Sequence, residues 1–249
     1  MNAARGSSRL FGLLRLKKPE TAAVTGGEQP TLALGALLQW LAGRSHPRVV
    51  DLGSAHGDNL ALFSRYGCRL DFLDLYPQLR ETAHPNPASE RERTRQLVAR
   101  TLGLDPGTPE GSSDPTPAPA RHAEAAGAID VLLVWDLLNY LSVPQIEGLY
   151  RALRPLCDTG TRAFLMLAHA PTLPLQPRRL RIAAADKLIW DQQAPSVRPC
   201  PQYSEHQLHK LFPDFAVERS FLMRHGVREY LLAIPEPRRP SGDRPPPPG

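Results

Sequence analysis

The stretch VVDLGSAHGD at residues 49–58 runs from an apolar strand through two glycines into the start of a helix. Paired valines favour an extended strand, and Gly53 and Gly57 permit a tight turn with a close backbone approach. Backbone N–H groups at such a turn face the crevice at the carboxyl ends of parallel strands, where open α/β sheets bind ligands. The stretch therefore predicts an α/β fold with a ligand site at this strand end.

A second acid narrows the kind of ligand. The spacing G-x-x-x-G, with Ala55 at the middle position, does not meet the dinucleotide fingerprint G-x-G-x-x-G. Asp74, however, ends the next apolar segment, where an acid can accept hydrogen bonds from both hydroxyls of a ribose. We therefore expect a nucleoside-containing ligand. Two structural alternatives stay open: the glycines serve only the turn, or Asp74 caps a helix.

Hydrophobic periodicity extends the pattern along the chain. Strands are predicted over 48–53, 69–77, 128–138, 161–170, 215–224 and 227–234, and helices over 32–43, 58–67, 88–104, 143–156, 178–190 and 204–212. The first helix has Thr31 as its expected cap. Alternating strands and helices indicate a mostly parallel sheet covered on both faces, and the last two strands form an antiparallel hairpin at its edge.

Prolines and charges mark the domain boundaries. Residues 1–29 are predicted to be a mobile basic arm, 30–235 one domain, 105–127 a proline-rich insertion within it, and 236–249 a disordered proline-rich tail. The two ends carry the whole net charge of +5, so the body is neutral. This balance argues against nucleic-acid binding by the folded body.

Other features bear on compartment and metal content. Three widely spaced cysteines form no Cys-x-x-Cys pair, which fits a reducing compartment, and we expect a cytoplasmic protein. An organellar presequence in the first 19 residues stays open as an alternative. No apolar run reaches the length of a membrane span. His206 and His209 lack a third ligand placed near them, so no metal site is expected.

Three stretches together resemble one family. VVDLGSAHGDN, DFLDLYP and IDVLLVWDLLNYLS are similar to motif I, the acidic end of the second strand and the motif IV strand of class I S-adenosylmethionine-dependent methyltransferases. The likeness covers roughly residues 31–234. It implies a Rossmann-like sandwich with a mostly parallel sheet and a C-terminal antiparallel hairpin, and S-adenosylmethionine as the cofactor.

The resemblance also implies site residues. The residues that would border the methionine and ribose of the cofactor are Asp51, Gly53, Ser54, Ala55 and Gly57. Asp74 would hold the ribose hydroxyls, and Leu75 would pack on the adenine. Trp135 and Asp136 would lie near the methionine end and the substrate, with Asn139 and Tyr140 at the rim. Asp136 as the cap of a short helix is the structural alternative.

The sequence departs from the family at two places. Ala55 stands where many members have a third glycine, and the proline-rich insertion stands where a third strand and an adenine contact are expected. These departures motivate an alternative function, a non-catalytic interaction module that binds the cofactor weakly or not at all. Another kind of nucleotide-binding Rossmann enzyme is disfavoured by the glycine spacing and the hairpin.

The methyl acceptor is constrained only loosely. A sulfonium methyl is already activated, so transfer requires mainly a positioned nucleophile and no particular catalytic residue. His169, Tyr203 and Tyr140 are the acceptor-side candidates. Five basic residues hint at a small anionic acceptor, although solvated surface charges would explain them equally well. They are Arg178, Arg179, Arg181, Lys187 and Arg198.

Overall fold

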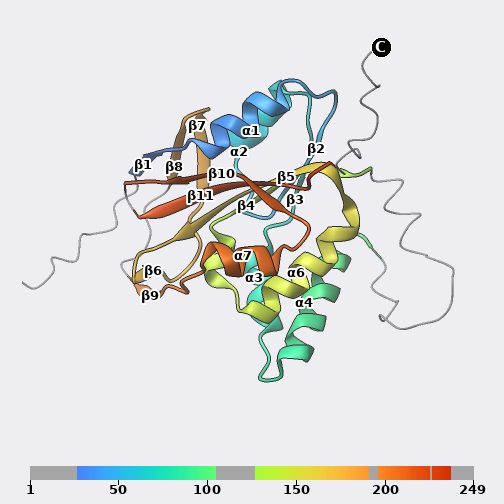
Figure 1. The fold of residues 1–249 in the computed structure, drawn as a ribbon, viewed down its shortest axis with the longest axis vertical. Coiled ribbons are helices and arrows are strands. Elements are labelled where there is room, and N and C mark those ends of the chain that lie inside the picture. The colour runs from blue at the N-terminus through green and yellow to red at the C-terminus, as the bar shows by residue number, and fades with distance from the viewer. Residues whose placement is uncertain (1–26, 105–126, 191–195, 225, 237–249) are drawn as a thin grey trace, which may run out of the picture.

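A computed structural model describes residues 27–104, 127–190, 196–224 and 226–236, and its centre is a six-stranded sheet (Figure 1). The strand order is β10-β11-β5-β4-β2-β3. The strands are β2 (Arg48–Asp51), β3 (Arg69–Phe72), β4 (Ile129–Trp135), β5 (Cys157–Ala168), β10 (Ala216–Leu222) and β11 (Val227–Ala233). Strands β3, β2, β4 and β5 are parallel, and β11 and β10 continue the sheet antiparallel. The predicted parallel sheet with its terminal hairpin is confirmed.

Helices cover both faces of this sheet. α1 (Ala33–Leu41) and α2 (Gly57–Arg65) lie on one face in Figure 1. The other face carries α3 (Leu75–Leu79), α4 (Pro87–Thr101), α6 (Val143–Leu153) and α7 (Glu205–Leu211). Short 3₁₀ turns complete the chain: η1 (Arg80–Thr82), η2 (Leu137–Tyr140) and η3 (Arg154–Leu156). Within the described residues, no helix has the length and apolar character needed to cross a bilayer.

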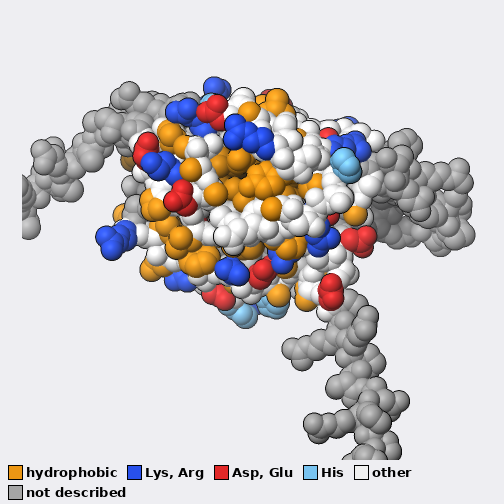
Figure 2. Space-filling view, turned by 90° about the horizontal axis from the view of Figure 1, so that it is seen from above, with side chains coloured by type: hydrophobic (Ala, Val, Ile, Leu, Met, Phe, Trp, Pro, Cys, Tyr) orange, Lys and Arg blue, Asp and Glu red, His pale blue; other side chains and the backbone are white. Residues whose placement is uncertain are grey.

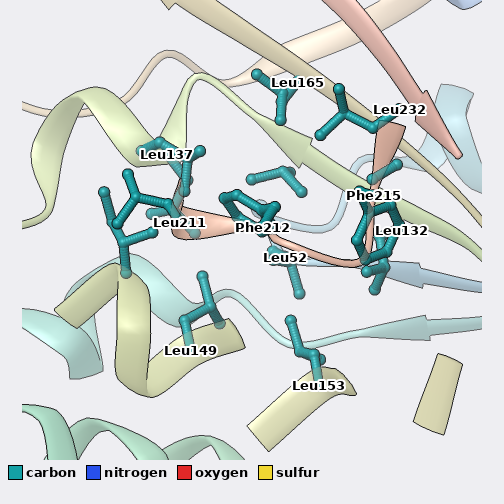
Figure 3. Packing of buried hydrophobic residues seen from close by; sticks show 14 of the residues in the cluster. Leu52, Leu132, Leu137, Leu149, Leu153, Leu165, Leu211, Phe212, Phe215 and Leu232 are labelled. Atoms are coloured by element: carbon teal, nitrogen blue, oxygen red, sulfur yellow. The ribbon is translucent and has the colours of Figure 1, made fainter. Parts of the chain in front are cut away.

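Two apolar clusters, one on each side of the sheet, form the core. Figure 3 shows the cluster on the α6 and α7 side, where Leu52, just after β2, lies near Phe212, and Leu132 of β4 lies near Phe215. The second cluster joins α1 to β2, β4, β5 and β11. A near-continuous apolar β4 fits this arrangement, because a central parallel strand is buried on both faces.

A small second sheet replaces a helix predicted over 178–190. β7 (Leu180–Ala184) and β8 (Lys187–Trp190) form a hairpin, and β1 (Gly27–Pro30) pairs with β8. Leu180, Ile182 and Leu188 are buried against the α1 side of the core. The alanine run suggested a helix, but period-2 burial at Leu180 and Ile182 makes this segment a strand. A two-stranded ribbon of β6 (Thr172–Pro174) and β9 (Val197–Pro199) lies nearby.

The terminal and inserted segments mostly lie outside the described residues. This holds for the arm up to residue 26, for residues 105–126 of the proline-rich insertion and for the tail from residue 237. Residues 27–29, predicted as part of the arm, are instead part of β1, because β8 supplies their hydrogen-bond partners. In the described part of the chain, β3 is the outermost strand on its side of the sheet.

A distant carboxylate caps α1. The Glu229 side chain, fully buried on β11, accepts hydrogen bonds from the backbone N–H groups of Leu32 at 2.8 Å and Ala33 at 3.0 Å. These are donors that a helix leaves unpaired at its first turn. The prediction that Thr31 caps this helix is wrong, since its buried hydroxyl has no partner among the described residues. The helix is therefore tied directly to the sheet.

The face over α1 carries an open apolar groove. Figure 2 views the molecule from this side and shows hydrophobic side chains gathered at its middle. The groove is lined by α1 together with Tyr66, Ala185 and Phe221. Leu32 at its edge is half exposed.

Replacing Glu229 by Ala tests whether its carboxylate caps α1. We expect Glu229→Ala to lower the free energy of unfolding by about 1–3 kcal/mol, because two N–H groups in a buried environment lose their acceptor. Urea denaturation measures the change. Glu218→Ala is the matched control, since Glu218 makes only an exposed ion pair with Arg162 and should cost under about 1 kcal/mol. Equal losses in the two variants would contradict the cap.

Candidate functional site

A cleft opens at the carboxyl ends of β2, β3 and β4. It is walled by residues that follow each of these strands and by a loop that precedes β7. The strand-end residues are Leu52, Gly53, Ser54, Asp74, Tyr76, Pro77, Val134, Trp135, Asp136 and Leu137, and the loop contributes Gln176–Leu180. The cleft holds about 680 Å³ of space, counting its open mouth. This is the position at which open α/β sheets bind their ligands.

One buried carboxylate organises the floor of this cleft. Asp51 Oδ1 accepts hydrogen bonds from the Gly53 backbone N–H at 2.9 Å and from the Trp135 indole Nε1–H at 2.6 Å. Trp135 has a left-handed backbone, with φ of 56°. A Cβ at Gly53 would lie 2.8 Å from the Trp135 ring, so only glycine permits this contact. The first glycine therefore serves the packing of the indole on the loop.

Burial makes the Asp51 carboxylate a weaker acid. Desolvation raises its pKa to about 6; the hydrogen bonds from Trp135 and Gly53 oppose the rise, and the nearby Asp74 carboxylate adds to it. Its second oxygen is buried with no partner among the described residues. Asp51 therefore lies beneath the cleft as a positioning group.

Asp74 stands at the opposite wall. It occupies the N-cap position of α3 in a left-handed conformation, with φ of 40° and ψ of 59°, yet its side chain makes no cap hydrogen bond. Aspartate is one of the few residues that tolerate this conformation. The Asp74 side chain therefore does not cap the helix. Its residue is exposed and lines the cleft.

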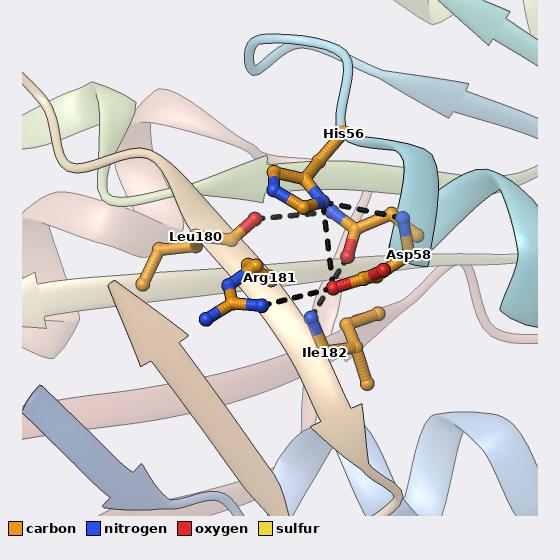
Figure 4. Close-up of polar contacts among 6 residues, drawn as sticks. His56, Asp58, Leu180, Arg181 and Ile182 are labelled. Carbon is orange, nitrogen blue, oxygen red and sulfur yellow. Dashed lines mark hydrogen bonds and ion pairs between the residues drawn. The ribbon is translucent and has the colours of Figure 1, made fainter. Parts of the chain in front are cut away.

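The start of α2 is hydrogen-bonded to β7, beside the cleft. Asn59 Nδ2 donates to the Leu180 carbonyl at 3.1 Å, and its Oδ1 accepts from the Ile182 N–H at 2.8 Å (Figure 4). Asp58 pairs with Arg181 at 3.1 Å in the same view, and the His56 ring accepts from the Asp58 N–H. β7 is thereby fixed beside the glycine loop, and the segment just before it is held over the cleft.

A second, smaller cavity adjoins the first. The two share Asp136, Arg178 and Leu180 as wall residues. Desolvation raises the pKa of Asp136 to about 6, against the lowering effect of the Arg178 guanidinium. Asp136 precedes η2, but its side chain makes no cap hydrogen bond there, so the capping alternative does not hold for the carboxylate. Asp136 therefore faces the junction of two cavities.

The comparisons with known proteins agree with this geometry. A family model described as "Methyltransferase domain" matches residues 28–215. The chain belongs to this methyltransferase family. No curated protein sequence matches it significantly.

Several solved structures are similar to this methyltransferase domain at low identity. The glycopeptide N-methyltransferase MtfA, complexed with S-adenosylmethionine, is 13% identical with a TM-score of 0.41, over 82% of this chain and 93% of that one. Magnesium protoporphyrin IX methyltransferase from Synechocystis is 14% identical with a TM-score of 0.38, over 80% and 77%. A methyltransferase from Clostridium acetobutylicum is 10% identical with a TM-score of 0.41, over 82% and 91%.

The structure brings together part of the cofactor set implied by the resemblance. Gly53, Ser54, Asp74, Trp135 and Asp136 all line the cleft. Ala55 and Gly57 are exposed and do not line the cleft, and a Cβ at Gly57 would meet no protein atom within 4 Å. Leu75 is fully buried in the core, which corrects its assignment to an adenine contact. Tyr76 takes the corresponding place in the wall.

The acceptor-side candidates separate in the same way. Tyr140 lines the second cavity, edge-to-face with Tyr76 at 5.5 Å, and burial raises its pKa far above the usual range. Tyr203 instead lies in the core and donates to the Leu141 carbonyl at 2.9 Å. His169 is exposed at the end of β5 and lines neither cavity. Tyr203 and His169 thus line neither of these two cavities, and an acceptor-side role for them stays a prediction.

The basic cluster divides between structural and cleft positions. Arg181 pairs with Asp58 and Lys187 pairs with Glu28 at 3.1 Å, so these two fasten elements of the fold. Arg178 and Arg179 line the cleft. Among the residues that the structure describes, no cluster of three His, Cys, Asp or Glu side chains could hold a metal ion.

Several wall residues escaped the sequence analysis. Residues 178–180 of the cleft fall in the helix predicted over 178–190, and Gln29 of the second cavity falls in the predicted arm. Gln29 lies in β1, and residues 176–179 come just before β7. No motif in the sequence predicts either of these strands. Tyr76 comes two residues after Asp74, but the direction of its side chain depends on the left-handed backbone of Asp74.

Gly53→Ala tests the close contact on the glycine loop. The added methyl group would overlap the Trp135 ring, so we expect a loss of stability of about 1–3 kcal/mol and a change in tryptophan fluorescence. Gly57→Ala is the control, because open space surrounds that position and the variant should be neutral or slightly stabilised. Thermal unfolding and emission spectra are the measurements. Identical behaviour of the two variants would refute the role given to Gly53.

Asp51→Asn tests the buried acid through pH. The pKa of Asp51 is higher in the folded protein than in the unfolded chain, so the native state binds more protons between about pH 4 and 6 and its stability falls as pH rises through that window. A shift of about two units corresponds to roughly 3 kcal/mol at most. The wild-type protein loses this stability between pH 4 and pH 7, and Asp51→Asn does not. The free energy of unfolding of Asp51→Asn minus that of the wild type should therefore increase over this range. Urea denaturation that gives a pH-independent difference would overturn the assignment.

Proposed function

We propose that this protein transfers a methyl group from S-adenosylmethionine to a small acceptor molecule. The observation that carries the proposal is the Asp74 carboxylate, which lines the same cleft as Gly53 and Ser54 and makes no cap hydrogen bond in its helix. A carboxylate so placed fits the two hydroxyls of a ribose. The family match of the chain to methyltransferase domains supports the same assignment.

The residues present fit this cofactor at three points. Asp74 would hold the ribose, and Tyr76 beside it offers an aromatic face. Ser54 and the loop after Gly53 border the cleft floor, as expected for the amino-acid end of the molecule. Arg179 lines this cleft and not the second cavity, which suits it to a carboxylate of the cofactor. When bound, S-adenosylmethionine supplies a methyl group that is already activated by its sulfonium.

The arginines therefore count less toward an anionic acceptor than the sequence suggested. Arg181 and Lys187 are engaged in ion pairs within the fold, and Arg179 faces the cofactor side. Arg198 stacks over the Tyr140 ring at 5.7 Å. We accordingly assign the basic cluster mainly to the fold and the cofactor.

Asp136 is the group suited to handle a proton. Its carboxylate lies where the two cavities meet. Its pKa is raised to about 6, which makes it a stronger base than an ordinary aspartate. Because this pKa is still below 7, the carboxylate is mostly ionised at pH 7. An acceptor that loses a proton on methylation could pass it to this carboxylate. Arg178 beside it would stabilise the ionised form.

Calorimetric titration with S-adenosylmethionine and S-adenosylhomocysteine tests the proposal. We expect micromolar binding to the wild-type protein and a loss of about 5- to 150-fold in Asp74→Ala, because the ribose hydroxyls lose their acceptor, a change of about 1–3 kcal/mol. Glu81→Ala is the matched control, since Glu81 is an exposed acid outside the cleft.

The outcomes separate the two functions considered. Unchanged affinity in Asp74→Ala would remove that residue from the site. No heat from either ligand at millimolar concentration would favour the non-catalytic interaction module. Ala55, one of the two reasons for that alternative, lies exposed outside the cleft and does not obstruct it.

A further inference from the structure

The second cavity has a mostly apolar wall. Met166 and Ala168 from β5, Leu173 and Pro174 from β6, and Val227 from β11 contribute apolar side chains to its lining. It holds about 400 Å³ of space, counting the open solvent at its mouth. The ribbon of β6 and β9, inserted between β5 and α7, forms one side of it.

The polar groups of this wall are used unequally. Asn139 is fully engaged: its Nδ2 donates to the carbonyls of Asp136 and Met166, and its Oδ1 accepts from the Ala168 N–H. Gln29, on β1, is only 3% exposed, and its Nε2 faces the Met166 sulfur at 3.6 Å. Its Oε1 is buried without a hydrogen-bond partner among the described residues. Buried side-chain oxygens almost always have a partner, so this oxygen, on a residue that lines the cavity, calls for a donor that the described residues do not supply.

We propose that the second cavity binds a small, largely apolar molecule whose O–H or N–H group donates a hydrogen bond to Gln29 Oε1. An amide oxygen accepts hydrogen bonds only, so it selects a donor and gives nothing to a carboxylate or an ether. This inference rests on the proposed function in one respect: the molecule held here is the methyl acceptor. Gln29 is then a residue that determines specificity, contributed by a strand outside the central sheet.

The position of the cavity supports this assignment. Asp136, Arg178 and Leu180 belong to both cavities, so a molecule in the second lies next to the cleft of the first. Tyr140 adds an aromatic face, which favours a flat ring as the apolar part of the ligand. A phenol or an indole has the required combination of an apolar body and one donor.

Binding of matched probes tests the inference on the full-length protein. The probes are 4-ethylphenol and indole, their methylated forms 4-ethylanisole and 1-methylindole, and the anion 4-ethylbenzoate, each titrated by protein-observed NMR. We expect the two donors to bind about fivefold or more tightly than their methylated forms. In Gln29→Leu this preference should fall below about twofold, while Gln39→Leu, on the exposed side of α1, keeps it.

Each outcome decides the question. Equal binding of donors and methylated forms, tighter binding of 4-ethylbenzoate, or no binding of any probe at millimolar concentration would overturn the inference. The wild-type preference is measured without any variant, so it stands even where Gln29→Leu fails to fold. Titration with S-adenosylmethionine is a separate measurement. Cofactor binding without a preference for the donor probes would contradict only this inference. A Gln29-dependent preference without cofactor binding would contradict only the proposed function.

Discussion

The site depends on one buried carboxylate. Asp51 Oδ1 holds both the Gly53 N–H and the Trp135 indole, so the end of β2 and the end of β4 are joined through a single oxygen. Isolated charges are costly to bury, and the raised pKa of Asp51 measures that cost. The strained backbones of Trp135 and Asp74 flank the same cleft. Residues in rarely populated conformations gather at functional sites, where the surrounding structure holds them in place.

The parts of the fold with local signals were predictable. The apolar runs of β2 and β4, the glycine turn and the acid after β3 each have a residue pattern that specifies a strand, a turn or a wall position. Leu75 shows where this reasoning ends: one residue after Asp74, a left-handed turn sends its side chain into the core and gives the cleft Tyr76. No pattern in the sequence sets the direction of that turn.

Interactions between distant segments account for the rest. Glu229 caps a helix that begins almost two hundred positions earlier, and β1 exists because β8 pairs with it. The alanines of 183–185 favour a helix by propensity, yet Leu180 and Ile182 bury themselves by pairing β7 with β8. In each case tertiary partners outweigh a weak local preference, and those partners are not visible from spacing along the chain.

The strands outside the central sheet contribute to the second cavity. The ends of the central strands place Asp51 beneath the cleft, Asp74 in its wall and Asp136 where the two cavities meet. The small sheet and the β6–β9 ribbon supply Gln29, Leu173 and the loop before β7, which shape the second cavity. Asn59 joins the two parts, since the helix that begins at the glycine loop also hydrogen-bonds β7 on both sides of Arg181. A change in β1 or β6 would therefore alter the wall of the second cavity while leaving the floor of the first intact.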